Sequence, residues 1–236
     1  MRRILLLAAL LGRLRPGGAE PSSHSSAPST DDTTTTTPMK VILGLGNPGK
    51  EYEQTRHNVG WWLVDHLADR WGLDGWKKDG QAKVAQGTLA GMKEAVRLVK
   101  PLTYMNLSGG VLVQYARRPF WSATTDLLVL VDEVAIPVGE WRLRAEGGAG
   151  GHNGLKSVQE SLGTQKYPRL RIGIGDPARP PGGPLSDYVL GAVGKRDTET
   201  IRGLFPVMTD AVEAWVRGGM QPALDVQARK RQDRPS

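Results

Sequence analysis

Two histidines lie in loops of the kind that could carry acid–base chemistry. His57 stands in the segment Thr55–Asn58, directly ahead of an amphipathic stretch, and His152 stands in the glycine-rich segment Gly147–Lys156. An imidazole titrates near neutrality and is the most practical general base for activating water, provided that a carboxylate fixes its tautomer. We expect His57 to be that base.

Two acidic residues are candidates for the carboxylate. Asp132 and Glu133 follow the wholly apolar run Leu127–Val131 and are therefore expected at the carboxyl end of a buried strand. The alternative is that they only begin a turn, because the sequence by itself does not establish a contact with His57.

Three asparagines recur at predicted junctions between a strand or glycine-rich loop and a helix: Asn47, Asn106 and Asn153. A single asparagine in such a place is usually a helix cap. Amides also offer both donors and acceptors to a neutral polar substrate, and flanking glycines allow the backbone to approach a ligand closely. Together with His57 they suggest direct attack of water on a carbonyl group.

Other chemistries are disfavoured. Gly44–Gly49 satisfies the dinucleotide-binding pattern G-x-G-x-x-G, but Pro48 lacks an N–H and the next helical pattern starts only near Gly60. The absence of cysteine excludes thiol nucleophiles, iron–sulfur clusters and cysteine-ligated zinc. There is no serine-hydrolase elbow, no H-E-x-x-H motif and no paired-histidine cluster. These absences disfavour nucleotide-cofactor, serine-hydrolase and zinc-hydrolase chemistry, and leave only histidine and carboxylate ligands for a metal.

Strand-like runs rich in Val, Ile or Leu alternate with helical patterns along the chain. The strands are expected at Lys40–Gly46, Ala95–Lys100, Asp126–Val131, Glu140–Ala145 and Arg169–Gly175. The helices are expected at Gly60–Trp71, Leu107–Arg117, Leu155–Leu162 and Thr198–Arg217. This alternation predicts an α/β domain with helices on both faces of a largely parallel sheet.

Two details of the helices are predicted from local sequence. Asn106 and Asn153 are good residues to cap the helices that follow them. Pro206 is expected to kink the helix Thr198–Arg217.

The chain has 236 residues, and its ends differ from the middle. We expect a disordered extension over residues 1–38, a folded domain over 39–225 and a flexible basic tail over 226–236. The extension could be a weak secretory signal, an organellar transit peptide or the product of a start codon upstream of the true Met39. We favour the last, which predicts a cytoplasmic protein, whereas a transit peptide would predict an organellar one.

The formal net charge is +7, with 31 Lys+Arg against 24 Asp+Glu. Such a balance suits an anionic partner such as nucleic acid, but a modest excess of basic residues also serves solubility alone. Composition does not decide between these readings.

The motifs together closely resemble the bacterial-type peptidyl-tRNA hydrolases. The segments that carry the likeness are Gly44–Gly49, Thr55–Asn58, Thr103–Gly109, Asp132–Glu133, Gly150–Lys156 and Arg169–Gly175. The resemblance implies a single domain with a twisted mixed sheet flanked by helices, and a monomer. It also implies hydrolysis of the ester that joins a peptide to the 3′-terminal ribose of tRNA, without a metal or cofactor.

The resemblance also assigns roles to residues. It implies that His57 is the catalytic base and Asp132 its partner, and that substrate contacts come from Asn47, Asn106, Asn153, Met105 and Tyr52. It implies that tRNA phosphates are bound by Arg142, Arg144, Arg171 and Arg179, with the acceptor stem and 3′ CCA end as the part recognised. Phosphate contacts of this sort are sensitive to salt.

One alternative function uses the same fold. A relative that supports RNA splicing in chloroplasts has this scaffold, so a non-catalytic RNA-binding protein is the competing interpretation. The retention of both His57 and Asp132 favours the enzyme, because a pure binding module does not need a histidine–carboxylate pair.

Overall fold

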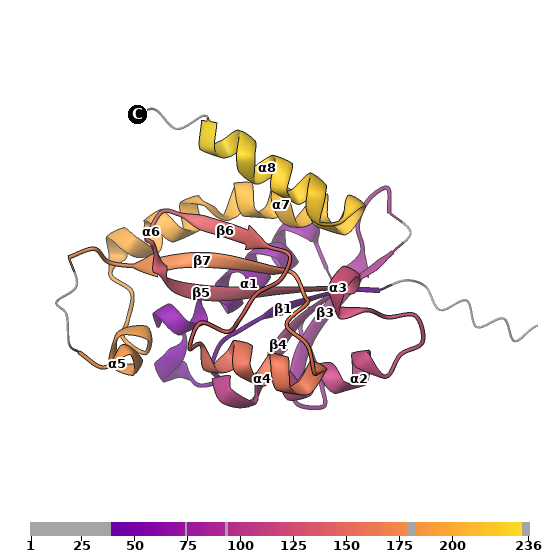
Figure 1. Ribbon diagram of the computed structural model, residues 1–236, viewed down its shortest axis with the longest axis horizontal. Helices are drawn as coiled ribbons and strands as arrows, with labels where there is room; N and C mark the ends of the chain where they lie inside the picture. Colours follow the sequence, from indigo (N-terminus) through magenta and orange to yellow (C-terminus); the bar gives the residue numbers. More distant parts are fainter. Residues whose placement is uncertain (1–38, 74, 93, 179–182, 233–236) are drawn as a thin grey trace, which may run out of the picture. The chain divides into compact units, whose positions relative to one another are not determined.

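The computed structural model describes residues 39–73, 75–92, 94–178 and 183–232, all within one compact unit that spans Thr36–Ser236. Its centre is a seven-stranded mixed sheet of order β2-β3-β4-β1-β5-β7-β6 (Figure 1). The predicted fold class, a mixed α/β sheet with helices on both faces, is confirmed. The predicted extension over residues 1–38 lies outside the described residues.

The middle of the sheet is parallel and apolar. It consists of β4 (Ala95–Pro101), β1 (Met39–Gly44), β5 (Leu127–Pro137) and β7 (Arg169–Gly175). Their Val, Ile and Leu residues are buried on both faces, as parallel strands covered by helices require. The carboxyl ends of these strands meet at one edge of the sheet, where α/β proteins usually bind ligands.

The margins of the sheet are antiparallel. On one side lie β3 (Ala82–Thr88) and β2 (Lys77–Asp79), and on the other lies β6 (Trp141–Arg144). The sequence analysis predicted β6 but missed β2 and β3, because neither contains a run of large apolar residues.

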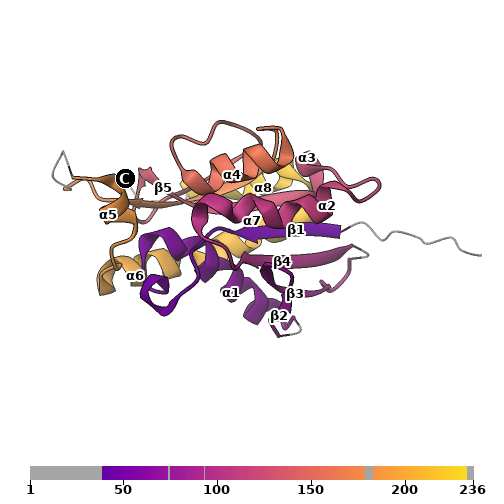
Figure 2. The same ribbon diagram turned by 90° about the horizontal axis from the view of Figure 1, so that it is seen from below.

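Helices cover both faces of the sheet (Figures 1 and 2). The first face carries α1 (Val59–Trp71) and α7 (Phe205–Gly218), which pack over one core cluster that includes Trp62 and Trp215. The second face carries the 3-10 helix η3 (Met105–Leu112), α2 (Val113–Ala116) and α4 (Asn153–Leu162), which pack over a second cluster that includes Tyr115 and Tyr167. The predicted helix Leu107–Arg117 is thus mostly a 3-10 helix, followed by a single α turn.

The connection from β1 to α1 is short and tightly packed. Two 3-10 helices, η1 (Lys50–Tyr52) and η2 (Arg56–Asn58), lead into α1. No α-helix follows the Gly44–Gly49 turn directly, as predicted. At the start of α1, a Cβ on Gly60 would lie 2.5 Å from the carbonyl oxygen of Leu130 and 2.6 Å from that of Leu45. Glycine at this position therefore lets η2 lie directly over the strand ends.

The C-terminal part departs from the prediction in two ways. The predicted single helix Thr198–Arg217 is divided at Leu204 into α6 (Lys195–Gly203) and α7, and Pro206 lies in the first turn of α7, where its missing N–H costs nothing. The predicted flexible tail is helical as far as Gln232, within α8 (Met220–Gln232).

Helix α8 is fixed by packing on α7 and by a buried polar contact. The Gln227 side chain is 7% exposed, and its Oε1 accepts a hydrogen bond from the N–H of Leu143 on the outermost strand β6. The remaining short helices are α3 (Ala123–Asp126) and α5 (Leu185–Val189). Within the described residues, no helix is long and apolar enough to cross a membrane.

Candidate active site

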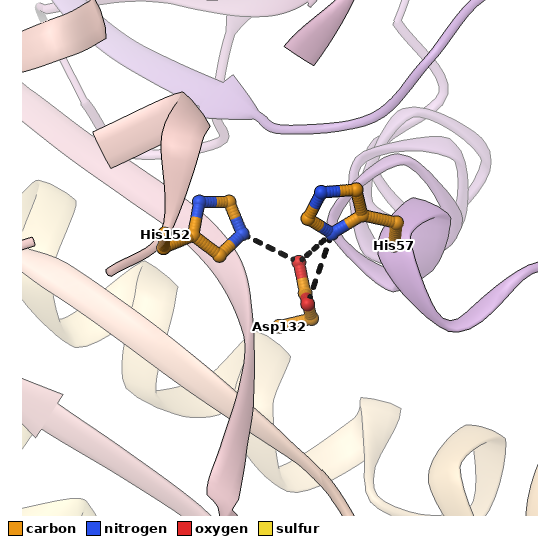
Figure 3. A group of neighbouring side chains, drawn as sticks. All are labelled: His57, Asp132 and His152. Atoms are coloured by element: carbon orange, nitrogen blue, oxygen red, sulfur yellow. Dashed lines mark hydrogen bonds and ion pairs between the residues drawn. The ribbon is translucent and has the colours of Figure 1, made fainter. Parts of the chain in front are cut away.

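His57 and Asp132 lie in contact beyond the end of β1. His57 Nδ1 is 3.0 Å from Oδ1 and 3.1 Å from Oδ2 of Asp132, and both side chains are largely buried (Figure 3). A carboxylate only accepts hydrogen bonds, so Nδ1 carries the proton and Nε2 keeps its lone pair. Among the described residues nothing forms a hydrogen bond with His57 Nε2, which leaves this atom available to accept a proton.

Asp132 belongs to β5 rather than to a loop after it. The sequence analysis placed it just past the strand, but β5 continues to Pro137, pairs with β7 and shifts register between Glu133 and Pro137. The neighbouring strand β1 pairs with β5 only as far as Leu130. Asp132 therefore projects beyond the end of β1 while its backbone is still held in the sheet.

The Asp132 carboxylate is ionised despite being only 4% exposed. Burial alone would raise its pKa, but His152 and then His57, through their electrostatic attraction and their hydrogen bonds, hold the pKa well below the usual range. An ionised carboxylate can orient an imidazole and stabilise the imidazolium that forms when the ring takes a proton.

A second imidazole, His152, also binds Asp132. Its Nε2 lies 2.8 Å from Asp132 Oδ1, so the carboxylate lies between two rings whose centroids are 4.8 Å apart (Figure 3). The other ring nitrogen, Nδ1, accepts hydrogen bonds from the N–H groups of Gly154 and Leu155 and so caps α4. The predicted cap, Asn153, is instead the first residue of the helix. The sequence analysis noted His152 but gave it no role.

His57, Asp132 and His152 form the kind of group that could hold a metal ion. Each offers one ligand atom, and these atoms lie within 4.8 Å of one another, although the sequence predicted no paired-histidine cluster. The hydrogen bonds argue against a metal here. Since Nδ1 of His152 faces two N–H donors, the single proton of the neutral ring resides on Nε2, and a metal at Nε2 would force that proton onto Nδ1 and break the cap.

Asn47 is held rigidly beside this cluster by Asn58. The Asn47 N–H donates to Asn58 Oδ1, and Asn58 Nδ2 donates to the Asn47 carbonyl oxygen, each over 2.9 Å. Asn47 Oδ1 accepts the N–H of Met105 at 2.7 Å. The Asn47 amide therefore has only its NH₂ group left, and no described residue binds it. We call residues 47–58 the base loop.

The glycine-rich segment on the other side of Asp132, residues 147–152, is named the glycine loop. Gly150 and Gly151 have φ angles of 57° and 84°, values that residues with side chains rarely adopt. This turn brings His152 back over Asp132, and the N–H of His152 donates to the carbonyl of Ala149 at 2.9 Å.

A pocket of about 220 Å³ opens over the cluster. It is lined by the three residues of the cluster, by Asn153 and the glycine loop, and by residues of α5. The α5 segment is tied to the base loop by Arg56, which stacks on Tyr188 and binds the carbonyl of Ala192 at 3.1 Å. A larger hollow of about 490 Å³ lies on the other side of Asn58 and includes neither His57 nor Asp132.

The other residues expected to bind substrate, Asn47, Tyr52, Met105 and Asn106, do not line this pocket. Asn106 is exposed on η3, and its neighbour Met105 is only 5% exposed and packs under the site in the second core cluster. Tyr52 is half-buried in η1. One aromatic side chain that the sequence analysis left without a role, Tyr104, is 60% exposed directly before Met105.

Three of the four predicted phosphate-binding arginines, Arg142, Arg144 and Arg171, share one face of the β6–β7 pair. Arg142 lies opposite Arg171, and Arg144 lies opposite Arg169. Arg171 is engaged by Glu133 Oε2 at 2.5 Å and by the carbonyl of Gly148, whereas Arg144 is exposed.

Two further points complete the arginine set. Arg142 is partly exposed and lies 3.8 Å from Glu140. Arg179, the fourth predicted cation, lies outside the described residues.

Arg169 is fully buried and has a structural role that the sequence analysis did not identify. Its guanidinium group donates to the carbonyls of Gly147 and Gly148 in the glycine loop, and to those of Gln165 and Tyr167 in the segment before β7. Arg169 therefore fixes the base of the glycine loop.

Comparisons with known proteins find one family over most of the chain. The profile of the peptidyl-tRNA hydrolase family matches residues 41–234. A peptidyl-tRNA hydrolase of Gemmatimonas aurantiaca is 53% identical over 192 residues, which are 81% of this chain and 100% of that protein. One from Brevibacillus brevis is 43% identical and covers 76% of this chain and 92% of its own length. The crystal structure of peptidyl-tRNA hydrolase from Acinetobacter baumannii superposes with a TM-score of 0.71 at 36% identity, covering 80% of this chain and 93% of that one.

Proposed function

The chain belongs to the peptidyl-tRNA hydrolase family, and we propose that it hydrolyses the ester bond between the peptide and the tRNA of peptidyl-tRNA. The observation that carries this proposal is the contact between His57 Nδ1 and Asp132, which leaves Nε2 with a free lone pair at the pocket. The products are a free peptide and a tRNA with a free 3′ end.

In the proposed reaction, His57 acts as general base. Its Nε2 takes a proton from a water molecule as the water oxygen attacks the ester carbonyl carbon, and Asp132 stabilises the imidazolium that results. The bond from that carbon to the ribose oxygen then breaks, and the proton passes from His57 to the leaving oxygen. Water is the only co-reactant, so no covalent enzyme intermediate, metal or cofactor is required.

We propose that three asparagines, Asn47, Asn106 and Asn153, bind the peptide and the region of the scissile ester. The NH₂ group of Asn47 is suited to donate to a peptide carbonyl, since its Oδ1 is occupied by Met105. Asn106 and Asn153 are both exposed, and their neighbours in the sequence, Met105 and Gly154, are buried against each other. Tyr52, within the base loop, is assigned to the same proposed binding surface.

We propose that the arginines on one face of β6 and β7 bind phosphate groups of the tRNA backbone. Arg144 is exposed and Arg142 partly exposed, and Arg171 forms an ion pair with Glu133, which lines the pocket. Arginine side chains suit phosphate groups because their planar guanidinium offers paired donors. We further propose that the protein acts as a monomer in the cytoplasm.

The decisive experiment measures release of peptide from N-blocked aminoacyl-tRNA by the purified protein. We expect the wild type to release peptide, His57→Ala to be inactive while still binding tRNA, and chelators to leave the rate unchanged. If the wild type binds tRNA but releases no peptide in any buffer, the non-catalytic RNA-binding interpretation is correct and the enzyme proposal fails.

A further inference from the structure

Both ring nitrogens of His152 are committed to partners that belong to different parts of the fold. Nδ1 accepts two N–H groups at the start of α4, at 3.1 Å and 3.3 Å, while Nε2 lies 2.8 Å from Asp132 of β5. A neutral imidazole has one proton, and a nitrogen that faces two donors must be the bare one. The helix cap therefore places the ring proton on Nε2, from which it is donated to Asp132.

We infer that His152 is a positioning residue that locks the Asp132 carboxylate to the start of α4, and thereby sets the orientation and tautomer of His57. The inference rests on the proposed function for its effect on catalysis. His152 acts through Asp132 and touches neither the attacking water nor the ester in this assignment.

Asp132 needs such a second partner because of its surroundings. Among the described residues, only the His57 and His152 rings donate hydrogen bonds to this carboxylate, and both converge on Oδ1. Without His152 the ring of His57 would be the one remaining donor among these residues, so a rotation of the carboxylate about its side-chain bonds would be opposed by His57 alone and would turn that ring with it. The Nε2–H of His152 removes this freedom.

The same contact joins the catalytic pair to a proposed substrate-binding residue. Asn153 follows His152 directly and begins α4, so any movement of Asn153 is passed to Asp132 through the cap. The glycine loop behind His152 is itself held, because Arg169 and Arg171 both bind the carbonyl of Gly148. Binding of the peptide at Asn153 and orientation of the base are thus mechanically connected.

Two substitutions of His152 separate the roles of its two ring nitrogens. In His152→Asn, the amide oxygen takes the place of Nδ1 and keeps the cap, because asparagine is a favoured capping residue, but the side chain is too short to reach Asp132. In His152→Gln, the amide NH₂ takes the place of Nε2 and keeps the donor to Asp132, while the cap is lost. Each variant thus serves as the control for the other.

The positioning role predicts that kcat falls about 10- to 100-fold in His152→Asn, the size expected for a misplaced catalytic group, with KM changed less than about twofold. It predicts that His152→Gln keeps kcat within about threefold but melts at a lower temperature than His152→Asn, because its helix is uncapped. A residue that only caps α4 gives the opposite ranking of activities. That ranking, in a protein whose wild type is active, would refute the inference while leaving the proposed function intact.

A second measurement is independent of turnover. Long-range ¹H–¹⁵N correlation NMR reports the tautomer of each histidine, and we expect Nε2–H for His152 and Nδ1–H for His57 in the wild type. In His152→Asn the His57 tautomer should become mixed, and in His152→Gln it should remain Nδ1–H. A wild-type His152 protonated on Nδ1, or a His57 tautomer unchanged in His152→Asn, would overturn the inference even if no peptide were released.

Discussion

The two loops that flank Asp132 use their polar groups in opposite ways. The base loop is held by hydrogen bonds between Asn47 and Asn58, and among the described residues it leaves His57 Nε2 and the Asn47 NH₂ without partners. His57 and Asn47 are fixed in place, yet each keeps one group for an incoming molecule.

The glycine loop keeps almost nothing in reserve. His152 uses both ring nitrogens, and the carbonyls of Gly147 and Gly148 are bound by Arg169 and Arg171 of β7. The comparison teaches that residue type does not determine role. Two histidines on one carboxylate differ because one has a free nitrogen, which suits catalysis, and the other has none, which suits positioning.

The largest expected effect comes from removing the group that both loops share. In Asp132→Asn the carboxylate that accepts from both imidazoles is replaced by an amide with a single acceptor oxygen, so the Nδ1–H tautomer of His57 is no longer enforced, and kcat should fall about 10²- to 10⁴-fold. Steady-state hydrolysis of peptidyl-tRNA measures this, with Asp126→Asn as the control, because Asp126 is the last residue of α3 and is paired with Lys40. Equal losses in both variants would mean that Asp132 has no special role.

The next substitution breaks the glycine loop alone. Arg169→Met removes a fully buried guanidinium group and leaves several carbonyls without a donor, which should lower the free energy of unfolding by about 3 kcal/mol. Urea unfolding measures the change. Its cross-strand neighbour on the same face supplies the matched control, since Arg144→Met should change stability by less than about 0.5 kcal/mol. If both variants were equally stable, Arg169 would not be what holds the loop.

A milder change breaks the base loop. Asn58→Ala removes two buried hydrogen bonds to the backbone of Asn47, and should cost about 2 kcal/mol of stability. It should also raise KM more than it lowers kcat, because Asn47 is displaced while His57 and Asp132 remain paired. Thermal unfolding and steady-state kinetics test this, and a drop in kcat alone would contradict the proposed binding role of Asn47.

The smallest effect is expected outside both loops, on the exposed part of β6. Arg144→Ala should weaken tRNA binding and make the slope of log affinity against log salt shallower by about 1, without changing kcat at saturating substrate. Filter binding over a range of salt concentrations measures the slope. A slope equal to that of the wild type would show that Arg144 contacts no phosphate.

The sequence predicted the parts of the fold whose signal is local. The runs before Gly46 and Asp132 are apolar throughout, and such runs predict buried parallel strands. Strand β3 was missed because its sequence, AKVAQGT, is too polar, and it becomes a strand only by pairing with β4. The sequence predicted a kink at Pro206 because proline disrupts the interior of a helix. The chain instead begins a new helix at Phe205, and in the first turn of that helix a proline is harmless.

The candidate site was also predicted only in part. The pairing of His57 with Asp132 was expected from the order of the motifs, although 75 residues separate the two. The role of His152 could not be read in advance, because Asn153 beside it is the better capping residue by type. Only the fold shows that the histidine reaches two partners at once.

The hydrogen bond between Gln227 and Leu143 has a consequence for how molecules of this protein meet one another. Strand β6 is the outermost strand on its side of the sheet, and an outermost strand offers unpaired backbone groups to any similar strand nearby. Gln227 occupies the N–H of Leu143, and α8 packs alongside β6. Helix α8 therefore hinders the addition of a strand from another molecule at this edge. A chain that ends before α8 should aggregate more readily, which light scattering would measure.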